Sequence, residues 1–295
     1  SSGISKKGWA YTLSGSRRYA DEGYIPGTYY NGWSYFIGID KRFGQKNLFS
    51  VVFFGAPTEN GKQGASLQES RNLTGNNYYN PYWGYQNGKK RNANIGKTDQ
   101  PVLIITQEHR FNNNTTITSA VSMSSGKRSA SSLDWFNAAD PRPDYYKYLP
   151  SFYKDSVLNN RLKQFYKEHP IRLQINFDEM RRVNQSNKDK RAYYIISKEK
   201  ANIQMAQHAF HYYFDWTDRM QFSFHVNSIL EQIEKTNSVL DLLGGNYFLN
   251  YNTWVSDDDA SVFQFDINQP DQKIKEGDIW GAHYSIKNID QQASA

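Results

Sequence analysis

The stretch RAYYIISKEKANIQMAQHAFHYYFDWTDRMQFSFHVNSIL, Arg191–Leu230, predicts two long β-strands joined by a tight turn. The first strand would run to Trp216, far beyond the roughly 5–6 residues of an ordinary strand. In the second, two kinds of side chain alternate: Phe222, Phe224 and Val226 on one face, and Gln221, Ser223, His225 and Asn227 on the other. Half-buried strands show this pattern, and so do strands with lipid on one side and water on the other.

Comparable strand patterns occur along the rest of the chain. Strands are expected at Gly8–Tyr19, Thr28–Phe43, Asn47–Gly55, Gln100–Phe111, Thr115–Ser125, and from Trp280 to Asn288. With the pair at Arg191–Leu230 this makes about eight strands, within the usual range for a sheet. Helical spacing is confined to Asp155–Glu168 and Phe177–Val183.

The connections between these strands alternate in length. Turns near Gly44, Asn113 and Thr217 are short, whereas residues 56–99, 126–190 and 231–278 form long connections. Successive connections of an antiparallel meander fall at opposite ends, so all long ones share one end. Outer-membrane barrels have short periplasmic turns and long extracellular loops. The expected fold is therefore all-β: residues 1–295 form part of one antiparallel transmembrane β-barrel domain.

This interpretation assigns the two faces of each strand. The side chains expected to face lipid are Trp9, Tyr11, Leu13, Ile37, Ile39, Phe222, Phe224 and Val226. An aromatic girdle near the short turns is expected from Phe43, Phe111, Tyr212, Tyr213 and Trp216. Ser223, His225 and Asn227 would face the lumen. The alternative is a soluble β-domain that buries its aromatic side chains.

Composition narrows the choice of function. The absence of cysteine excludes disulfides, thiolate metal sites and cysteine nucleophiles. Aromatic residues make up 16% of the chain, yet its mean hydropathy is −0.80. No apolar run approaches the roughly 20 residues of a membrane helix. The net charge of +6 comes without a basic helix or a recognised module, which argues against nucleic-acid binding. No signal peptide is found at Ser1, so we expect a mature chain or a piece of a larger one.

Several loop segments resemble a known family. They are NNYYNPYWGYQNGKKRNANI (Asn76–Ile95), LDWFNAADPRPDYYKYLPSFY (Leu133–Tyr153), LLGGNYF (Leu242–Phe248) and GSRRYADEGYIPGTYY (Gly15–Tyr30). With the strands between them, they resemble the barrel of TonB-dependent outer-membrane receptors of the Bacteroidetes type. The resemblance covers most of the chain, but its patterns are not catalytic motifs.

The resemblance implies a barrel of 22 strands, plugged by an N-terminal domain, that takes up nutrients with energy from an inner-membrane complex. The chain departs from the family by showing no TonB box, no plug and no final strand that ends in an aromatic residue. About fourteen strands would be missing, so a fragment of a wide barrel fits better than a closed small barrel. The implied partners are outer-membrane lipid, the missing plug and strands, a TonB-type energy-transducing protein and a surface lipoprotein.

The expected ligand contacts are aromatic side chains of the outer loops, which would stack on sugars or flat ligands. They are Tyr78, Tyr79, Tyr82, Trp83, Tyr85, Trp135, Tyr145 and Tyr146. The alternative is that these rings pack the loops against one another.

Ionisable residues give weaker signals. Asp257, Asp258 and Asp259 fit a solvated loop better than a cation site, and no metal site is expected. Asp140 and Asp144 are expected to cap turns. His208 and His211 fall on opposite faces of one strand, so they cannot share a metal there.

The sequence favours a receptor and transporter of the outer membrane of a Gram-negative bacterium. The alternative is a soluble carbohydrate-binding β-domain. No enzyme is expected, because the chain has no nucleophile elbow, P-loop or dinucleotide fingerprint. A glycan-active enzyme would need paired carboxylates, for which only Asp40 and Glu108 are placed on strands. No cofactor is implied, and siderophore, peptide and glycan ligands all stay open.

Overall fold

The computed structural model describes residues 1–217, 219–250 and 272–294. Its strands are β1 (Trp9–Ala20), β2 (Tyr30–Phe43), β3 (Asn47–Gly55), β4 (Thr58–Gly61), β5 (Trp83–Gln86), β6 (Lys89–Asn92), β7 (Ile95–Asp99), β8 (Val102–Asn112), β9 (Thr115–Trp135), β10 (Ile175–Asn176), β11 (Tyr194–Thr217), β12 (Met220–Asp241) and β13 (Ile279–Ser294). The α-helices are α1 (Gln68–Thr74), α2 (Ser156–Glu168) and α3 (Phe177–Ser186). Among these residues, no helix has the length and apolarity needed to cross a membrane.

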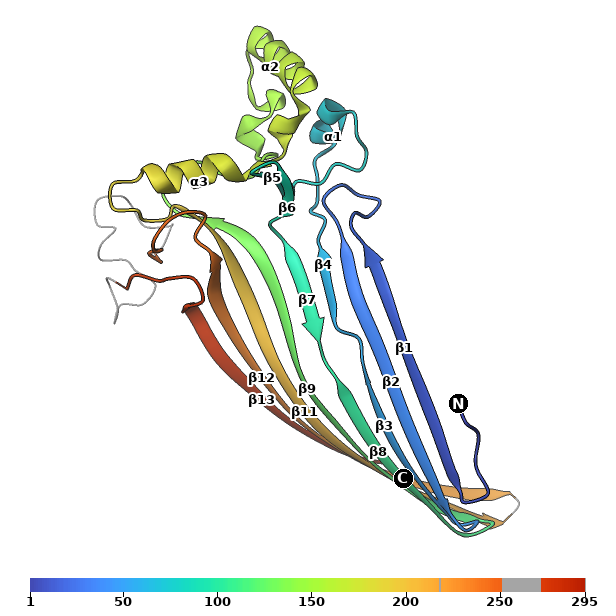
Figure 1. Cartoon of the computed structure of the whole chain (residues 1–295). Helices are drawn as coiled ribbons and strands as arrows, with labels where there is room; N and C mark the ends of the chain where they lie inside the picture. The colour runs from blue at the N-terminus through green and yellow to red at the C-terminus, as the bar shows by residue number, and fades with distance from the viewer. Residues whose placement is uncertain (218, 251–271, 295) are drawn as a thin grey trace.

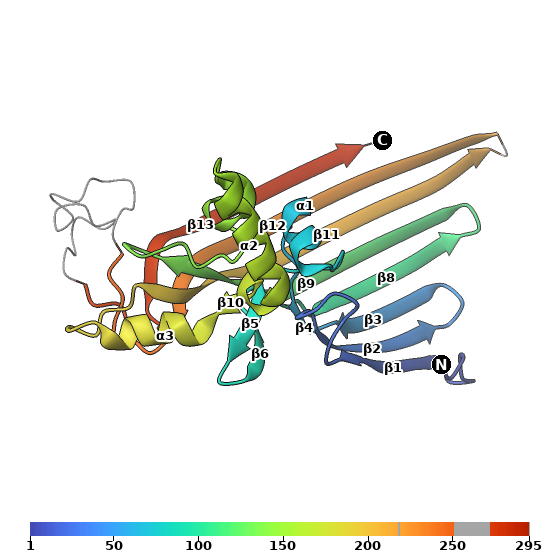
Figure 2. The ribbon, with the colours of Figure 1, turned by 90° about the horizontal axis from the view of Figure 1, so that it is seen from above.

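The long strands form one curved antiparallel sheet (Figures 1 and 2). Near the short turns, the order is β1-β2-β3-β8-β9-β11-β12-β13, with every neighbouring pair antiparallel. Strands β4 and β7 continue β3 and β8 and pair with each other. Counted this way, the sheet has the eight long strands that the sequence predicts.

Two of the eight strands are interrupted at a proline. Ala56 and Pro57 separate β3 from β4, and Gln100 and Pro101 separate β7 from β8. Proline has no N–H to donate to a ladder, so it occurs at sheet edges and irregularities. The Pro57 carbonyl still accepts the Trp33 N–H at 3.0 Å, which keeps the interrupted strand against β2.

The strand register separates the side chains into two faces. Residues directly opposite in an antiparallel pair share a face, so the pairs Tyr11–Ile39 and Leu13–Ile37 lie together. Following the same register from β2 to β13 collects one apolar set: Trp9, Tyr11, Leu13, Ile37, Ile39, Phe49, Val51, Phe53, Leu103, Ile105, Ile117, Val121, Met123, Phe210, Tyr212, Phe214, Phe222, Phe224, Val226, Leu230 and Ile289. The eight side chains expected to face lipid therefore all share one face.

The opposite face carries mainly small and polar side chains, although Phe36, Val52, Phe54 and Ile104 also lie on it. It includes Thr12, Gly38, Ser50, Thr106, Thr118, Ala120, Ala209, His225 and Asn227. His208 and His211 fall on different faces, as predicted. The girdle prediction was wrong for Tyr213, which lies opposite Thr116 and Ser223 on this polar face. Its hydroxyl donates to Asp215 Oδ1 at 2.6 Å.

Regular structure extends into the ranges predicted as long connections. Strand β9 continues to Trp135 and β12 to Asp241, well beyond the predicted ends at Ser125 and Leu230. The predicted helices are confirmed. Asp155 caps α2 by accepting the Val157 N–H at 2.8 Å, as expected of an aspartate at this position.

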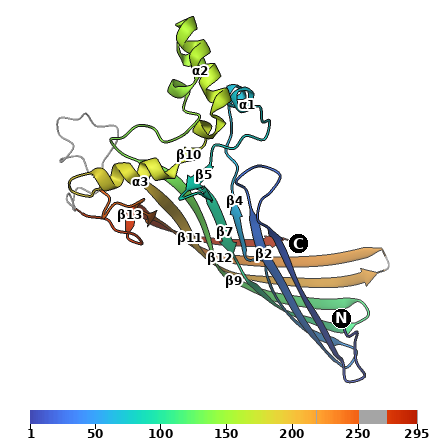
Figure 3. The same cartoon turned by 45° about the horizontal axis from the view of Figure 1, so that its top comes forward.

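The helices and a small sheet gather beyond one end of the long strands, while the short turns lie at the other end (Figures 1 and 3). The small sheet has the order β10-β5-β6. Ile175 pairs in parallel with Gly84, and a Cβ on Gly84 would stand 1.8 Å from the Ile175 carbonyl oxygen. Only glycine allows the two loops to approach this closely.

Most of the hydrophobic core lies at this loop end. One cluster joins Phe177 and Met180 of α3 to Tyr194 and Ile196 of β11. Another joins Leu73 and Tyr79 of the range 56–99 to Leu149 and Leu173 of the range 126–190. The loops are thus a packed body with its own core, built on the end of the sheet.

Candidate functional site

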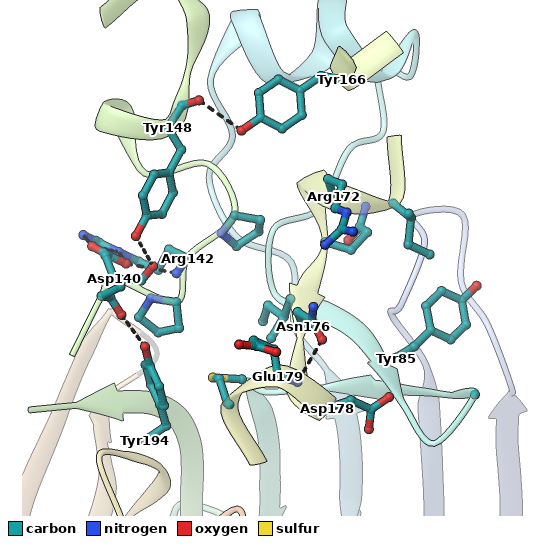
Figure 4. A pocket seen from close by; sticks show the side chains of 18 residues that line it. Tyr85, Asp140, Arg142, Tyr148, Tyr166, Arg172, Asn176, Asp178, Glu179 and Tyr194 are labelled. Carbon is teal, nitrogen blue, oxygen red and sulfur yellow. Dashed lines mark hydrogen bonds and ion pairs between the residues drawn. The ribbon is translucent and has the colours of Figure 1, made fainter. Parts of the chain in front are cut away.

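Two adjoining cavities, here called the upper cleft, lie within the loop body. The first, of about 680 Å³, is lined by residues of β5, α3 and the segment around Asp140 (Figure 4). The second, of about 640 Å³, lies next to it and shares Arg142 and Ile175 with the first. Both volumes fall in the roughly 300–1,000 Å³ range of small-molecule sites.

Asp140 and Arg142 form a fixed ion pair at the junction of the two cavities. Arg142 Nη2 lies 2.5 Å from Asp140 Oδ2, and its Nε donates to Asp140 Oδ1 at 2.9 Å. The Arg142 backbone N–H donates to the same carboxylate at 2.9 Å. Tyr148 donates to the Asp140 carbonyl at 2.8 Å. The prediction that Asp140 caps a turn is confirmed, because its side chain binds a backbone N–H two residues ahead.

Aromatic rings flank the Arg142 guanidinium. Its Cζ lies 5.3 Å from the ring centre of Trp135 and 5.5 Å from that of Tyr145. Cations within about 6 Å of an aromatic ring are attracted to its face. The hydrogen bond to Asp140 raises the pKa of Arg142. The Asp140 carboxylate therefore balances the positive charge of the guanidinium and holds it in place before any ligand binds.

The other side of the first cavity is acidic. Asn176 caps α3 by accepting the Glu179 N–H at 3.0 Å, and this places Asp178 and Glu179 at the cavity (Figure 4). Asp178 Oδ1 accepts the Asn87 N–H at 2.9 Å. A hydrogen bond from Arg182 lowers the pKa of Glu179. Glu179 thus stays ionised at neutral pH, and Arg172 is the cation on this side.

Asp144, in the second cavity, is a partly buried carboxylate. Burial raises the pKa of Asp144 above its usual value, and the nearby Arg142 only partly offsets this effect. Burial likewise raises the pKa of Tyr148 and Tyr166, so both phenols stay protonated. Tyr166 donates to the Tyr148 carbonyl at 3.1 Å. Because both phenol protons are already donated to backbone carbonyls, the upper cleft offers phenol and carboxylate oxygens as acceptors, together with aromatic faces.

Of the eight aromatic residues expected to contact ligand, five line the upper cleft and three do not. Tyr82, Trp135, Tyr145 and Tyr146 meet in the second cavity, and Tyr85 lines the first. Tyr79 and Trp83 are buried, with 2% and 7% of their surface exposed, so their predicted exposure was wrong. Tyr79 serves the loop core by donating to the Leu173 carbonyl at 2.7 Å. Tyr78 is exposed and contacts Tyr24 edge to face, away from both cavities.

Sequence reasoning missed the polar half of the upper cleft. Arg142, Tyr148, Tyr166, Arg172 and Glu179 lie within the range 126–190, but no spacing rule brings them together. It also missed that His211 and His225 stack across β11 and β12, with ring centres 4.0 Å apart. Asp257–Asp259 lie outside the described residues. Within the described residues, no group of three or more potential metal ligands occurs.

The two carboxylates considered for an enzyme are not paired. Asp40 lies opposite Ser50, and Glu108 lies opposite Leu48, so β3 separates them on the polar face. The arrangement gives no reason to assign hydrolysis to them.

Comparisons with known proteins give structural similarity only. No protein-family model and no curated protein sequence matches the chain. Among solved structures, the chain is similar to BauA, the ferric preacinetobactin receptor from Acinetobacter baumannii, with TM-score 0.43 and 8% identity over 79% of this chain. It is also similar to the ferric-catecholate import receptor Fiu from E. coli K12. The closed form gives TM-score 0.43 and 10% identity over 82% of this chain, and the open form 0.42 and 9% over 86%. The chain spans 27%, 31% and 34% of the lengths of these three structures.

Proposed function

We propose that this chain is part of the barrel wall and outer loop body of an outer-membrane receptor that imports a nutrient with TonB-dependent energy. In this proposal the apolar face contacts lipid, the polar face lines the lumen, and the upper cleft captures the ligand. The loop segments quoted above are the ground for assigning it to the Bacteroidetes type, with a surface lipoprotein as partner.

The observation that carries the proposal is the apolar belt that crosses the sheet on one face, interrupted by polar side chains such as Ser119, His208 and Ser228. On β11 the belt runs from Ala206 to Phe214, and on β12 from Phe222 to Leu230. These stretches match the roughly 9–11 residues that a tilted strand needs to cross a bilayer. Beyond them the same face turns polar, at Gln204 and Gln232. An apolar belt of this limited height fits the hydrocarbon core of a bilayer.

The soluble alternative has less support. A carbohydrate-binding sandwich would bury the apolar face under a second sheet. In the described residues the only other sheet is the small β10-β5-β6 sheet, which belongs to the loop body. Belt side chains are instead left open, with Leu13 77% exposed and Phe222 49% exposed. Exposed apolar area of this extent marks an interaction surface in a soluble protein.

The upper cleft favours a neutral, hydroxyl-rich ligand such as an oligosaccharide. Four carboxylates line it (Asp140, Asp144, Asp178 and Glu179), against the guanidinium groups of Arg142 and Arg172. Asp140 already binds Arg142, so the remaining charge is net negative and would repel an anionic chelate. Aromatic rings offer sugars flat apolar contact, while Tyr148 and Asp178 provide polar groups for hydroxyls.

Fractionation and gel migration test the membrane assignment. The protein expressed in its natural host is expected in the outer-membrane fraction, and its gel mobility should shift on boiling because intact barrels resist detergent. Recovery as a detergent-free soluble monomer would contradict the assignment. A periplasmic soluble protein from the same cells serves as the fractionation control.

A further inference from the structure

A basic recess opens on the apolar face just beyond the end of the belt. It has a volume of about 370 Å³ and lies where the two prolines interrupt their strands. Four lysines line it: Lys97 of β7, Lys127 of β9, and Lys198 and Lys200 of β11. All four share the face that carries the belt. Glu59 and Asp99 are the acidic residues in its lining.

The strand register brings the lysines around one small residue. Ser129 lies opposite Lys97 on one side and opposite Lys200 on the other. Lys127 is two residues away on the same strand and therefore on the same face, and Lys198 lies opposite Ser131. Adjacent strands are about 4.8 Å apart, so Lys97, Lys127 and Lys200 are the neighbours of the short Ser129 side chain on this face. This geometry leaves space for an anion above Ser129.

The two carboxylates that line the recess do not balance the charge of its four lysines. Lys97 Nζ pairs with Glu59 Oε2 at 2.7 Å, and this hydrogen bond lowers the pKa of Glu59. Lys127, Lys198 and Lys200 have no carboxylate within 4.0 Å in the described part of the chain. Asp99 lies directly opposite Lys127, yet the four lysines of the lining outnumber its two carboxylates. A bound anion would offset the remaining positive charge.

The position of the recess indicates which anion. Moving up β9, the belt ends at Met123, Ser125 follows on the same face, and Lys127 comes next. Trp33 lines the recess, as expected of an aromatic side chain at the membrane boundary. The lysines therefore point outward at the level where lipid headgroups of the outer leaflet begin. Basic residues at a membrane surface attract anionic lipids.

We propose that this recess binds the phosphate groups of a phosphorylated glycolipid of the outer leaflet, lipid A. The inference rests on the proposed membrane location but not on the imported ligand. The acyl chains of the lipid would lie along the belt, and its phosphate would sit over Ser129 among Lys97, Lys127 and Lys200. The recess thus recognises the membrane rather than the nutrient.

Native mass spectrometry of the detergent-solubilised protein tests the proposal. The probes are bisphosphoryl lipid A, dephosphorylated lipid A and inorganic pyrophosphate. We expect bisphosphoryl lipid A to bind roughly tenfold more tightly than the dephosphorylated form, because basic residues at a membrane surface attract anionic headgroups. The triple variant Lys127→Gln, Lys198→Gln, Lys200→Gln should abolish that preference. Equal binding of the two lipids, or pyrophosphate binding as tight as lipid binding, would overturn the proposal.

Two controls keep the result interpretable. The first control is Lys235→Gln. Lys235 lies opposite Ala201, the residue after Lys200, and therefore on the other face of the sheet. This variant should keep the lipid preference of the unmodified protein. If the triple variant fails to assemble, the single change Lys127→Gln should weaken binding, and Lys127→Arg should restore it. A protein that is absent from the outer membrane contradicts the proposed function, whereas a heat-modifiable protein without phosphate preference contradicts this inference alone.

Discussion

Asn184 of α3 and Tyr194 of β11 are joined by two hydrogen bonds between the Asn184 amide and the Tyr194 backbone. Asn184 Nδ2 donates to the Tyr194 carbonyl at 2.8 Å, and the Tyr194 N–H donates to Asn184 Oδ1 at 3.2 Å. The same amide also donates to the Leu242 carbonyl at 2.9 Å. Asn184 is fully buried. One side chain thus connects α3 to the start of β11 and to the chain just after β12.

Replacing Asn184 should loosen the loop body. Asn184→Ala leaves buried backbone groups without partners, each costing about 1–3 kcal/mol. We expect local stability to fall by about 2–4 kcal/mol. Hydrogen exchange of residues 177–196 should then accelerate while exchange in β9 stays slow. Gln185→Ala, an exposed change on the same helix, should leave exchange unaltered. Equal exchange in both variants would show that the amide does not hold α3 in place.

The two faces of β12 should tolerate charge differently. Val226 lies in the middle of the belt and Asn227 on the polar face. Val226→Lys should cost about 2–4 kcal/mol, as for a lysine at the bilayer midplane, and should reduce the heat-modifiable form. Asn227→Lys should assemble normally. If the two variants assemble equally, the apolar face does not contact lipid.

Tyr146 provides a test of ligand binding that spares the fold. Its ring is 53% exposed and lines the second cavity. On an array of neutral and acidic oligosaccharides we expect the unmodified protein to bind neutral glycans, and Tyr146→Ala to weaken binding roughly tenfold. Tyr78→Ala, which removes an exposed ring outside both cavities, should bind as before. A preference for acidic glycans would contradict the assigned ligand class.

Asp144 should make the loop body less stable at neutral pH. Its pKa is raised above 3.8 in the folded chain by burial. The folded state therefore disfavours the ionised form, and the resulting destabilisation is fully present above the raised pKa and absent below 3.8. Asp144→Asn should raise the melting temperature at neutral pH but not below that value. A pH-independent difference would show that the effect does not come from ionisation.

The sequence predicted the sheet well because its strands repeat one simple pattern. Alternation at Phe222–Val226 identifies a face, and the unequal connections order the strands. The ends of β9 and β12 were missed, since beyond Ser125 and Leu230 the side chains on the belt face are polar. Strands β4 and β7 were missed because residues 56–99 are polar and rich in Asn, Gly and Tyr, which predicts a connection.

The site was predicted only in part, for a different reason. Aromatic content locates the loops, but burial depends on contacts between distant segments. Tyr79 is buried because Leu149 and Leu173 pack against it, and neither is near it in sequence. Trp135 and Tyr146, by contrast, line a cavity. No local pattern distinguishes these outcomes.

Because Ile175 pairs in parallel with Gly84, neither loop segment can be exchanged with that of another protein on its own. The segment 56–99 needs a strand from 126–190, and Ser151 donates its N–H to Glu69 at 2.9 Å, which joins them again. Exchanging one segment between related chains would therefore leave each half without its counterpart. If the upper cleft binds ligand as proposed, a change of ligand should require both segments to be transferred together.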